Sequence, residues 1–452
     1  MVSTTSSQAR PSRGDELELT IDSLAHGGNG VARRDGYVVF VAGAVPGDRV
    51  RAVVGKAKRA YAEARAVEVL EPSPDRIAPR AHHPGAPWQV LPYERQLEVK
   101  ASQVREALER IGKLDGFELE PIVPAVEEWR YRNKLEYSFG TGTGGELVCG
   151  FHAPGRWDQI VPMDDCLLAS ERSNVVREQV LEWARLEGLS AWDRRDQHGL
   201  LRNLVIREGR RTGELQVRLV TSPGSIDTDS LAAAVKCDGL FWTKQEQLGE
   251  TVQGGETVLL SGTPKLREQV RGLEFMISPE AFFQTNTEMA ERLYTVAADM
   301  AALRGHERVF DLYCGIGTIG LSLAARAREV VGVEIVEPAV ADAIENARLN
   351  DIVNARFYAG DIRLAMRDLV EQAGRPDVAV VDPPRAGLSQ KVVRRILEAQ
   401  PSRIVYVSCN PTTLAPNAAQ MVEAGYRLSR VRPVDMFPQT PHIESVALLE
   451  RG

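Results

Sequence analysis

Residues 271–452 alternate short apolar runs with longer segments of helical spacing, and this alternation constrains the fold more than any other feature of the chain. It is typical of a parallel β-sheet with helices on both faces, the Rossmann-like α/β fold. Ligands of such sheets bind just outside the carboxyl ends of the strands, so we expect functional residues directly after them. The expected strands are Arg308–Leu312, Val330–Glu334, Arg356–Tyr358, Val378–Asp382, Ile404–Ser408 and Glu444–Leu449.

A glycine-containing loop, DLYCGIGT at residues 311–318, follows the first expected strand. Gly315 and Gly317 allow the backbone to turn sharply and to approach a ligand closely. Glu334 ends the next strand, where a carboxylate can accept hydrogen bonds from ribose hydroxyls. The loop also fits a dinucleotide-binding protein, but Gly320 stands one position too early to be the third glycine of that fingerprint.

The same loop, together with Glu334 and the later Gly360-Asp361, resembles the cofactor loop of class I methyltransferases. This resemblance implies S-adenosylmethionine as the cofactor. It also implies that the adenine of the cofactor lies near Asp361.

Three further motifs stand at the ends of the later strands. The motif DPPR at residues 382–385 contains two prolines that fix a rigid turn, and Asp-Pro-Pro is either such a turn or the related motif of amine methyltransferases. Cys409 follows the fifth strand and is well placed to attack a ligand, although most buried cysteines only pack. Glu444 begins the last strand and by itself could be an ordinary edge charge, as His442 could be a structural histidine.

Methylation of ring carbon 5 of uracil needs both a cysteine and a carboxylate. That carbon is too weak a nucleophile until a thiolate adds to ring carbon 6 and leaves an enolate. The enolate oxygen needs hydrogen-bond donors, and a general base must afterwards remove the proton from carbon 5. An amine methyltransferase needs neither group, so Cys409 and Glu444 together favour uracil as the substrate.

These residues together resemble the RNA uridine-5 methyltransferases, which make 5-methyluridine in ribosomal or transfer RNA. The resemblance spans nearly the whole chain and implies that Cys409 is the nucleophile and Glu444 the base. Gln284 could instead touch the uracil edge, and Phe283 could stack on a base or pack in the core. The positions matched to cofactor contacts are Gln284, Tyr313, Thr318, Glu334, Asp361 and Asp382. The motifs are Phe282–Asn286, Asp311–Gly317, Asp382–Leu388, Ser408–Pro411 and Asp435–Glu444.

The amino-terminal region predicts a small OB-like barrel of about five strands, because short alternating runs are separated by Gly-rich turns. Its segments 24–32, 38–41 and 46–48 resemble the TRAM domain, an RNA-binding barrel. Two basic clusters suit either charged edge strands with a solvated face, the commoner case, or an RNA partner despite a net charge of −7. The aromatic residues among them favour RNA, because bases stack on such rings. The clusters are Arg49, Arg51, Lys56, Lys58, Arg59 and Arg65, and then Arg130, Arg132 and Lys134, which stand among Trp129 and Tyr131.

One departure from the family concerns cysteines. Many ribosomal-RNA members with a TRAM domain hold an iron–sulfur cluster on four cysteines, three of them just before the helix that corresponds to Tyr93–Ile111. Residues 78–89 contain no cysteine here, and only Cys166 matches the fourth position. One thiolate cannot hold such a cluster, so we expect none. His82 and His83 could bind a metal, but adjacent histidines without further ligands are usually surface residues, and no metal is expected.

The length of 452 residues predicts several domains. We expect a TRAM barrel over residues 14–72. A central α+β domain should comprise residues 73–92 and 120–270, and the S-adenosylmethionine-dependent methyltransferase domain residues 93–119 and 271–452. Residues 1–13 are expected to be a disordered tail.

The five cysteines are scattered, which favours a reducing cytoplasm over a disulfide framework. No apolar run approaches the roughly 18 residues that cross a membrane. The expected function is methyl transfer from S-adenosylmethionine to ring carbon 5 of a specific uridine, in ribosomal rather than transfer RNA, by a monomer. The alternatives are an RNA or protein amine methyltransferase that uses the DPPR motif, and a non-catalytic RNA-binding protein.

Overall fold

The computed structural model describes residues 10–34, 36–249 and 251–452. The chain divides into two compact units. The first comprises residues 1–82, 86–103 and 438–442, and the second comprises residues 83–85, 104–437 and 443–452. Most of the tail expected over residues 1–13 lies outside the described residues.

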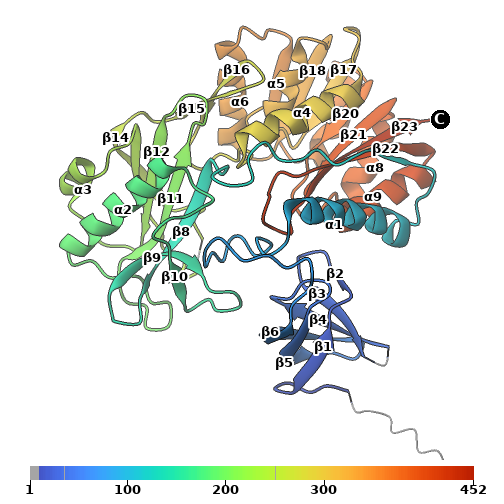
Figure 1. The fold of residues 1–452 in the computed structure, drawn as a ribbon. Helices are drawn as coiled ribbons and strands as arrows, with labels where there is room; N and C mark the ends of the chain where they lie inside the picture. The colour runs from blue at the N-terminus through green and yellow to red at the C-terminus, as the bar shows by residue number, and fades with distance from the viewer. Residues whose placement is uncertain (1–9, 35, 250) are drawn as a thin grey trace, which may run out of the picture. The chain divides into compact units, whose positions relative to one another are not determined.

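The first unit contains a six-stranded sheet in the order β1-β5-β6-β4-β3-β2, drawn in blue in Figure 1. Alternate residues of the strands point into a core that includes Leu19, Val39 and Val50. The fully buried Asp48 accepts hydrogen bonds from the backbone amides of Val45 and Ser73 at 2.9 Å, which fixes the turn before β5. The strands are β1 (Glu16–Thr20), β2 (Ser23–Leu24), β3 (Gly30–Arg34), β4 (Tyr37–Ala42), β5 (Arg49–Ala57) and β6 (Tyr61–Glu71).

The central part of the second unit is a seven-stranded sheet in the order β10-β9-β8-β11-β12-β13-β14. One face of this sheet packs on helix α2 through a core that includes Tyr137, Val180 and Leu204. The elements are β8 (Lys134–Thr141), β9 (Leu147–His152), β10 (Ile160–Pro162), α2 (Glu171–Leu186), β11 (Leu201–Glu208), β12 (Leu215–Thr221), α3 (Thr228–Ala234), β13 (Gly239–Lys244) and β14 (Glu256–Gly262). A hairpin of β15 (Leu266–Val270) and β16 (Leu273–Ile277) follows.

The carboxyl-terminal part is an eight-stranded sheet in the order β19-β18-β17-β20-β21-β23-β22-β7. Helices α4, α5 and α6 bury one face of it, and α7, α8, α9 and the π-helical turn η1 bury the other. The strands are β7 (Glu118–Leu119), β17 (Arg308–Leu312), β18 (Glu329–Glu334), β19 (Ala355–Ala359), β20 (Val378–Val381), β21 (Arg403–Ser408), β22 (Tyr426–Val434) and β23 (Glu444–Arg451). The helices of this part are η1 (Ala107–Ile111), α4 (Thr287–Ala301), α5 (Thr318–Ala324), α6 (Glu337–Leu349), α7 (Ile362–Ala373), α8 (Gln390–Ala399) and α9 (Pro411–Glu423). Helix α1 (Tyr93–Glu106) falls largely within the first unit.

The predicted fold class is therefore confirmed: a barrel of strands, a mixed central sheet and a doubly wound α/β sheet. Strands β22 and β7 were not among the strands expected from the sequence. Strand β22 alternates arginines with apolar residues and contains Pro433, so it lacks the continuous apolar run of a fully buried strand. Strand β7 has only two residues, too few for any periodicity to show.

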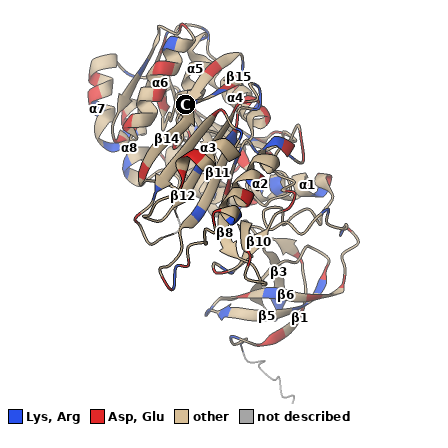
Figure 2. Ribbon diagram, turned by 90° about the vertical axis from the view of Figure 1, so that its left-hand side faces the viewer, with Lys and Arg blue, Asp and Glu red and all other residues tan. Residues whose placement is uncertain are grey.

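The basic clusters are largely paired with acids. Arg49 and Arg51 on β5 form ion pairs with Glu18, Glu68 and Glu71 on neighbouring strands, and Figure 2 shows blue and red segments on these strands. In the second cluster Arg130 pairs with Asp165, and Tyr131 is fully buried. The idea that Tyr131 stacks on a base is therefore wrong, because its ring packs in the core of the central sheet.

Across the residues that the structure describes, no helix is both long and apolar enough to span a membrane.

Candidate active site

The expected site residues gather at one edge of the eight-stranded sheet. Strands β17, β18, β20 and β21 run parallel, so their carboxyl ends share that edge. Tyr313, Asp382 and Cys409 directly follow three of these strands, and Glu334 is the last residue of β18. Strand β23 runs antiparallel to β21, so its first residue, Glu444, lies at the same edge.

The strand register places Cys409 beside Glu444. Ser408, at the end of β21, pairs with Ser445 of β23, so the next position on β21 lies opposite Glu444. The loops after β20 and β21 are also tied together, because Asn410 Nδ2 donates to the carbonyl oxygen of Arg385 at 3.1 Å. Asn410 Oδ1 in turn caps helix α9 by accepting from the amide of Thr412 at 3.0 Å.

The glycine-containing loop turns back on itself after β17. Tyr313, Gly315 and Gly317 have positive φ angles of 65°, 53° and 86°. The carboxylate of Glu334 accepts from the amide of Gly315 at 3.2 Å and from that of Val336 at 2.9 Å. A Cβ atom added to Gly315 would meet nothing within 4 Å, so space lies open above the loop where a ligand can approach the backbone.

Two hollows meet at Tyr313. One is lined by the Phe282–Gln284 segment, Asp311, Asp382 and the loop around Gly315 and Thr318. The other is lined by Ile335, Gly360, Asp361, Arg363 and Gly387. Tyr313 lines both hollows, which suits an elongated nucleoside ligand that reaches from one to the other, and a buried oxygen of Asp311, Oδ1, has no hydrogen-bond partner among the described residues. The site therefore fits S-adenosylmethionine.

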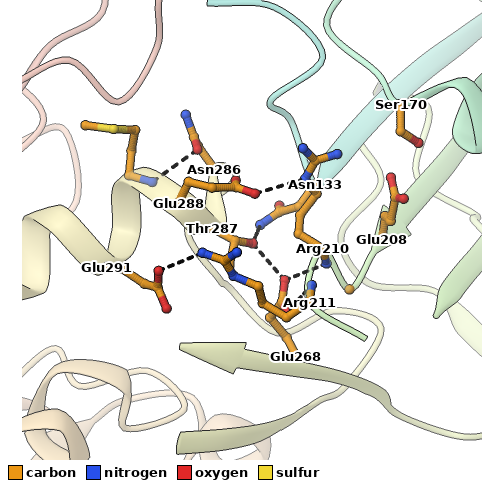
Figure 3. A network of polar contacts seen from close by, with 12 residues as sticks. Asn133, Ser170, Glu208, Arg210, Arg211, Glu268, Asn286, Thr287, Glu288 and Glu291 are labelled. Atoms are coloured by element: carbon orange, nitrogen blue, oxygen red, sulfur yellow. Dashed lines mark hydrogen bonds and ion pairs between the residues drawn. The ribbon is translucent and has the colours of Figure 1, made fainter. Parts of the chain in front are cut away.

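A buried polar network holds the segment before α4, which carries Gln284 (Figure 3). Asn133 Nδ2 donates to the carbonyl oxygen of Gln284 at 2.9 Å and to Thr287 Oγ1 at 2.8 Å. Thr287 Oγ1 donates to Glu268 at 2.7 Å, and Asn286 Oδ1 accepts from the amide of Met289 at the start of α4. These bonds fix the backbone on both sides of Gln284, whose side chain lines the first hollow.

Comparison with known proteins identifies the family. Residues 263–452 match the family model of tRNA (uracil-5-)-methyltransferases, and residues 11–67 match the TRAM domain. An RNA methyltransferase of Halalkalibacterium halodurans, itself described as uncharacterized, is 40% identical over 98% of both chains. One from Bacteroides thetaiotaomicron is 39% identical over 94% of this chain and 100% of the relative.

A solved structure agrees with these relatives. The tRNA (uracil-54, C5)-methyltransferase of Pyrococcus abyssi, in complex with S-adenosyl-L-homocysteine, is 30% identical over 96% of this chain and 99% of that chain, with a TM-score of 0.79. This chain belongs to the RNA uracil-5 methyltransferase family. S-adenosylmethionine is its cofactor, and the TRAM domain implied by the resemblance of segments 24–32, 38–41 and 46–48 is confirmed.

Buried carboxylates dominate the electrostatics of this uracil-5 methyltransferase. Burial raises the pKa of Asp311 to about 7, and burial together with the nearby Asp311 raises that of Asp382 to about 7. Burial also raises the pKa of Glu444 well above its usual value, and the charge of Asp382 adds to this, while Arg385 opposes it. Several like charges at one edge therefore favour a ligand with a positive centre.

Burial, together with the charges of Glu444 and Asp382, raises the pKa of the Cys409 thiol to about 12, against the opposing charge of Arg385. The cysteine of the methyltransferase is thus a thiol at neutral pH, and it needs a base when it reacts.

The remaining predicted contacts differ in their surroundings. Thr318 Oγ1 accepts from the hydroxyl of Tyr294 at 3.1 Å. Asp361 caps α7 by accepting from the amide of Arg363 at 2.8 Å, and the Arg363 guanidinium beside it lowers the pKa of this carboxyl. Asp361 lies in the second hollow with Tyr313, apart from the hollow that holds Gln284, Thr318 and Asp382.

Sequence reasoning missed two residues in the first hollow. Phe282 is 66% exposed beside the cofactor loop, whereas Phe283, for which base stacking was considered, is buried in the core. Tyr294 reaches the hollow from α4, and burial raises its pKa. Tyr294 gave no local signal in the sequence, because it is one of many buried positions on α4.

The segment without the cluster cysteines holds a buried contact. His83 Nε2 lies 3.2 Å from Cys166 Sγ, and His83 is only 4% exposed. The expectation that both adjacent histidines lie at the surface is therefore wrong for His83, because its ring packs against Phe151 and Cys166; His82 is exposed. Within the described part of the chain, no three His, Cys, Asp or Glu residues are grouped so that they could hold a metal.

Proposed function

We propose that this methyltransferase modifies ring carbon 5 of a specific uridine through a covalent adduct between Cys409 and ring carbon 6 of the uracil. The observation that carries the proposal is the register of β21 and β23, which sets Glu444 opposite Cys409. Both lie at the edge of the eight-stranded sheet where the expected site residues gather, which we call the cofactor edge. Packing alone does not explain a buried glutamate beside a cysteine at this position, because burying a carboxylate costs free energy.

In the first step the Cys409 sulfur forms a bond to ring carbon 6. The thiol proton moves to Asp382, which is close enough to raise the thiol pKa, so Glu444 stays an unprotonated carboxylate for the last step. The electron pair of the carbon 5–carbon 6 double bond moves toward the ring carbonyl as an enolate, which makes carbon 5 nucleophilic. Gln284 offers an amide donor in the first hollow, which Asp382 also lines.

S-adenosylmethionine supplies the methyl group that carbon 5 receives. The residues that hold this cofactor are Gln284, Tyr313, Thr318, Glu334, Asp361 and Asp382, with Glu334 suited to the ribose hydroxyls. The glycine loop brings its backbone close to the ligand, and the buried carboxylates of Asp311 and Asp382 offer negative charge near a cationic centre.

In the last step Glu444 removes the remaining proton from carbon 5, the double bond re-forms and Cys409 leaves as a thiolate. A carboxylate whose pKa is raised by burial is a stronger base than an exposed one, which suits this task. A uridine inside folded RNA must leave its stack to reach such a pocket.

Trapping with 5-fluorouridine tests this proposal. RNA that carries 5-fluorouridine at the target position should form a stable adduct through Cys409, because fluorine cannot leave as a proton does. Denaturing electrophoresis and mass spectrometry would locate the adduct. If the wild-type enzyme methylates uridine RNA but traps nothing with the fluorinated RNA, and Cys409→Ala stays active, then the enzyme uses another chemistry, such as amine methylation.

Ribosomal RNA is the proposed substrate, because the TRAM domain adds a second RNA-binding surface to the catalytic one. The solved relative, by contrast, is named for a position in transfer RNA. Mapping of 5-methyluridine in both RNA classes, with and without the gene, tests the choice. Loss of the modification from a ribosomal position supports the proposal, and loss only from transfer RNA contradicts it.

A further inference from the structure

A second cavity lies in the central sheet, apart from the residues of the cofactor hollows. It forms where the carboxyl ends of β8 and β9 meet the start of β11, and the loops 153–159 and 187–200 cover it. We call it the Trp157 cavity. The lining residues that matter here are Trp157, Asp158, Trp192, Arg195, Arg202 and Asn203.

Two tryptophans in the lining each carry an arginine beside the ring. The guanidinium of Arg195 lies 5.0 Å from the ring centroid of Trp157, and that of Arg202 lies 4.8 Å from the centroid of Trp192. Trp157 is 50% exposed, so its indole presents a flat surface to solvent. Alternating indole and guanidinium planes are the arrangement on which unpaired nucleobases stack.

The floor of the cavity has polar atoms suited to a base edge. Asn203 is only 5% exposed, and its Nδ2 donates to Ser138 Oγ at 3.2 Å. Asn203 Oδ1 and Trp192 Nε1 are buried without a hydrogen-bond partner among the described residues. A buried acceptor and a buried donor cost free energy until a ligand supplies the complementary groups, and the edge of a nucleobase carries both.

The carboxylates of the cavity are already engaged by the protein. Asp158 accepts from Arg156 at 2.9 Å and from Arg195 at 3.1 Å, and Asp193 accepts from the backbone amide of Arg195 at 2.7 Å. Arg194 is exposed, with its guanidinium 5.8 Å from the Trp157 ring. Basic side chains therefore surround the cavity mouth, which suits the phosphates on either side of a bound base.

We propose that the Trp157 cavity binds an unpaired base of the RNA substrate, at a nucleotide other than the methylated uridine. The base stacks on Trp157, its edge meets Asn203 and Trp192, and the adjoining phosphates lie beside Arg194 and Arg195. This inference rests on the proposed function in one respect, that RNA is the substrate. It adds a positioning site within the central sheet that holds one nucleotide while another reacts.

The test measures binding of a fluorescein-labelled 12-nucleotide single-stranded RNA to the full-length enzyme by fluorescence anisotropy. Trp157→Ala should weaken binding by about ten- to a hundredfold, because it removes the stacking surface. Trp157→Phe should stay within about threefold of the wild type, since it keeps an aromatic face. Affinity for S-adenosylmethionine, measured by calorimetry, should be unchanged in both variants.

A second measurement needs no substitution. The same RNA with 4-thiouridine should crosslink under long-wavelength light to the peptide that contains residues 153–159, as identified by mass spectrometry. The inference is wrong if Trp157→Ala binds the RNA with the affinity of the wild type, and the cavity would then suit a protein partner instead. It is also wrong if Trp157→Phe loses as much RNA affinity as Trp157→Ala. If 5-fluorouridine trapping fails while Trp157→Ala still loses RNA affinity, the proposed chemistry is wrong and the cavity remains an RNA site.

Discussion

The charged side chains at the cofactor edge differ in kind from those that line the Trp157 cavity. At the edge, burial raises the pKa values of Asp311, Asp382 and Glu444, and for Asp311 and Asp382 it raises them to about 7, so the charge of these two can change near neutral pH. In the Trp157 cavity, arginines lie beside the tryptophan rings, and Asp158 is paired with Arg195. Groups that can exchange protons suit bond making, and permanent cations on aromatic planes suit binding. The difference separates catalysis from RNA positioning within one unit.

The largest effect should follow from Cys409→Ala. This change removes the proposed nucleophile, so methyl transfer should fall by at least about 10⁴-fold. Incorporation of labelled methyl groups into RNA measures it. Cys237→Ala is the matched control, since Cys237 is also a half-buried cysteine with a raised pKa but lies in the central part of the unit, and its rate should stay within about twofold. If Cys409→Ala kept one tenth of the wild-type activity, Cys409 would not be the nucleophile.

Glu444→Gln should lower turnover by about 10²- to 10⁴-fold, because the proton on carbon 5 then lacks a base. The adduct should accumulate with ordinary uridine RNA and appear as a slower band on a denaturing gel. Glu450→Gln, near the other end of β23, is the control and should turn over normally without a band. Rapid turnover by Glu444→Gln would show that the base lies elsewhere.

The pH dependence of cofactor binding tests whether the carboxyls at the cofactor edge change their charge near neutral pH. Asp311 and Asp382, with pKa values of about 7, are mostly protonated at pH 6 and mostly ionised at pH 8. S-adenosylmethionine carries a positive sulfonium and S-adenosylhomocysteine a neutral sulfur. The preference for the first over the second should therefore rise roughly tenfold between these pH values.

Calorimetry with both ligands measures that preference in the wild type and two variants. Asp382→Asn should flatten the pH dependence, because one of the titrating carboxyls is gone. Asp368→Asn, on the exposed side of α7, should leave it as in the wild type. An equally steep dependence in Asp382→Asn would mean that other groups carry it.

The smallest effect belongs to the Trp157 cavity. Arg194→Ala should weaken the 12-nucleotide RNA by about two- to fivefold and reduce the slope of log affinity against log salt by about 0.7, as expected for one lost phosphate contact to a single strand. Adduct formation with saturating 5-fluorouridine RNA should be unchanged. Arg172→Ala, on α2 outside the cavity lining, should leave the slope unchanged. Slower adduct formation in Arg194→Ala would contradict the separation of catalysis at the cofactor edge from RNA binding at the Trp157 cavity.

The sequence alone determined the alternation of strands and helices, the motif after each strand and the residue types at the site. These features are local, because periodicity and turn residues are set by neighbours a few positions away. The alternation predicted the fold class, and the resemblance of the ordered motifs to RNA uridine-5 methyltransferases implied the cofactor and the family. Short strands and Gly-rich turns predicted a small domain of strands at the amino terminus, and its resemblance to known sequences implied a TRAM domain.

Only the tertiary structure decided which side chains meet. Glu444 faces Cys409 because β23 runs antiparallel to β21 in one register, and no short window of sequence encodes that pairing. The burial of His83 and Tyr131 follows from contacts with residues far along the chain. The Trp157 cavity arises in the same way, from two loops and three strand ends that converge. Strand order and register, which depend on the packing of the whole sheet, brought these residues together.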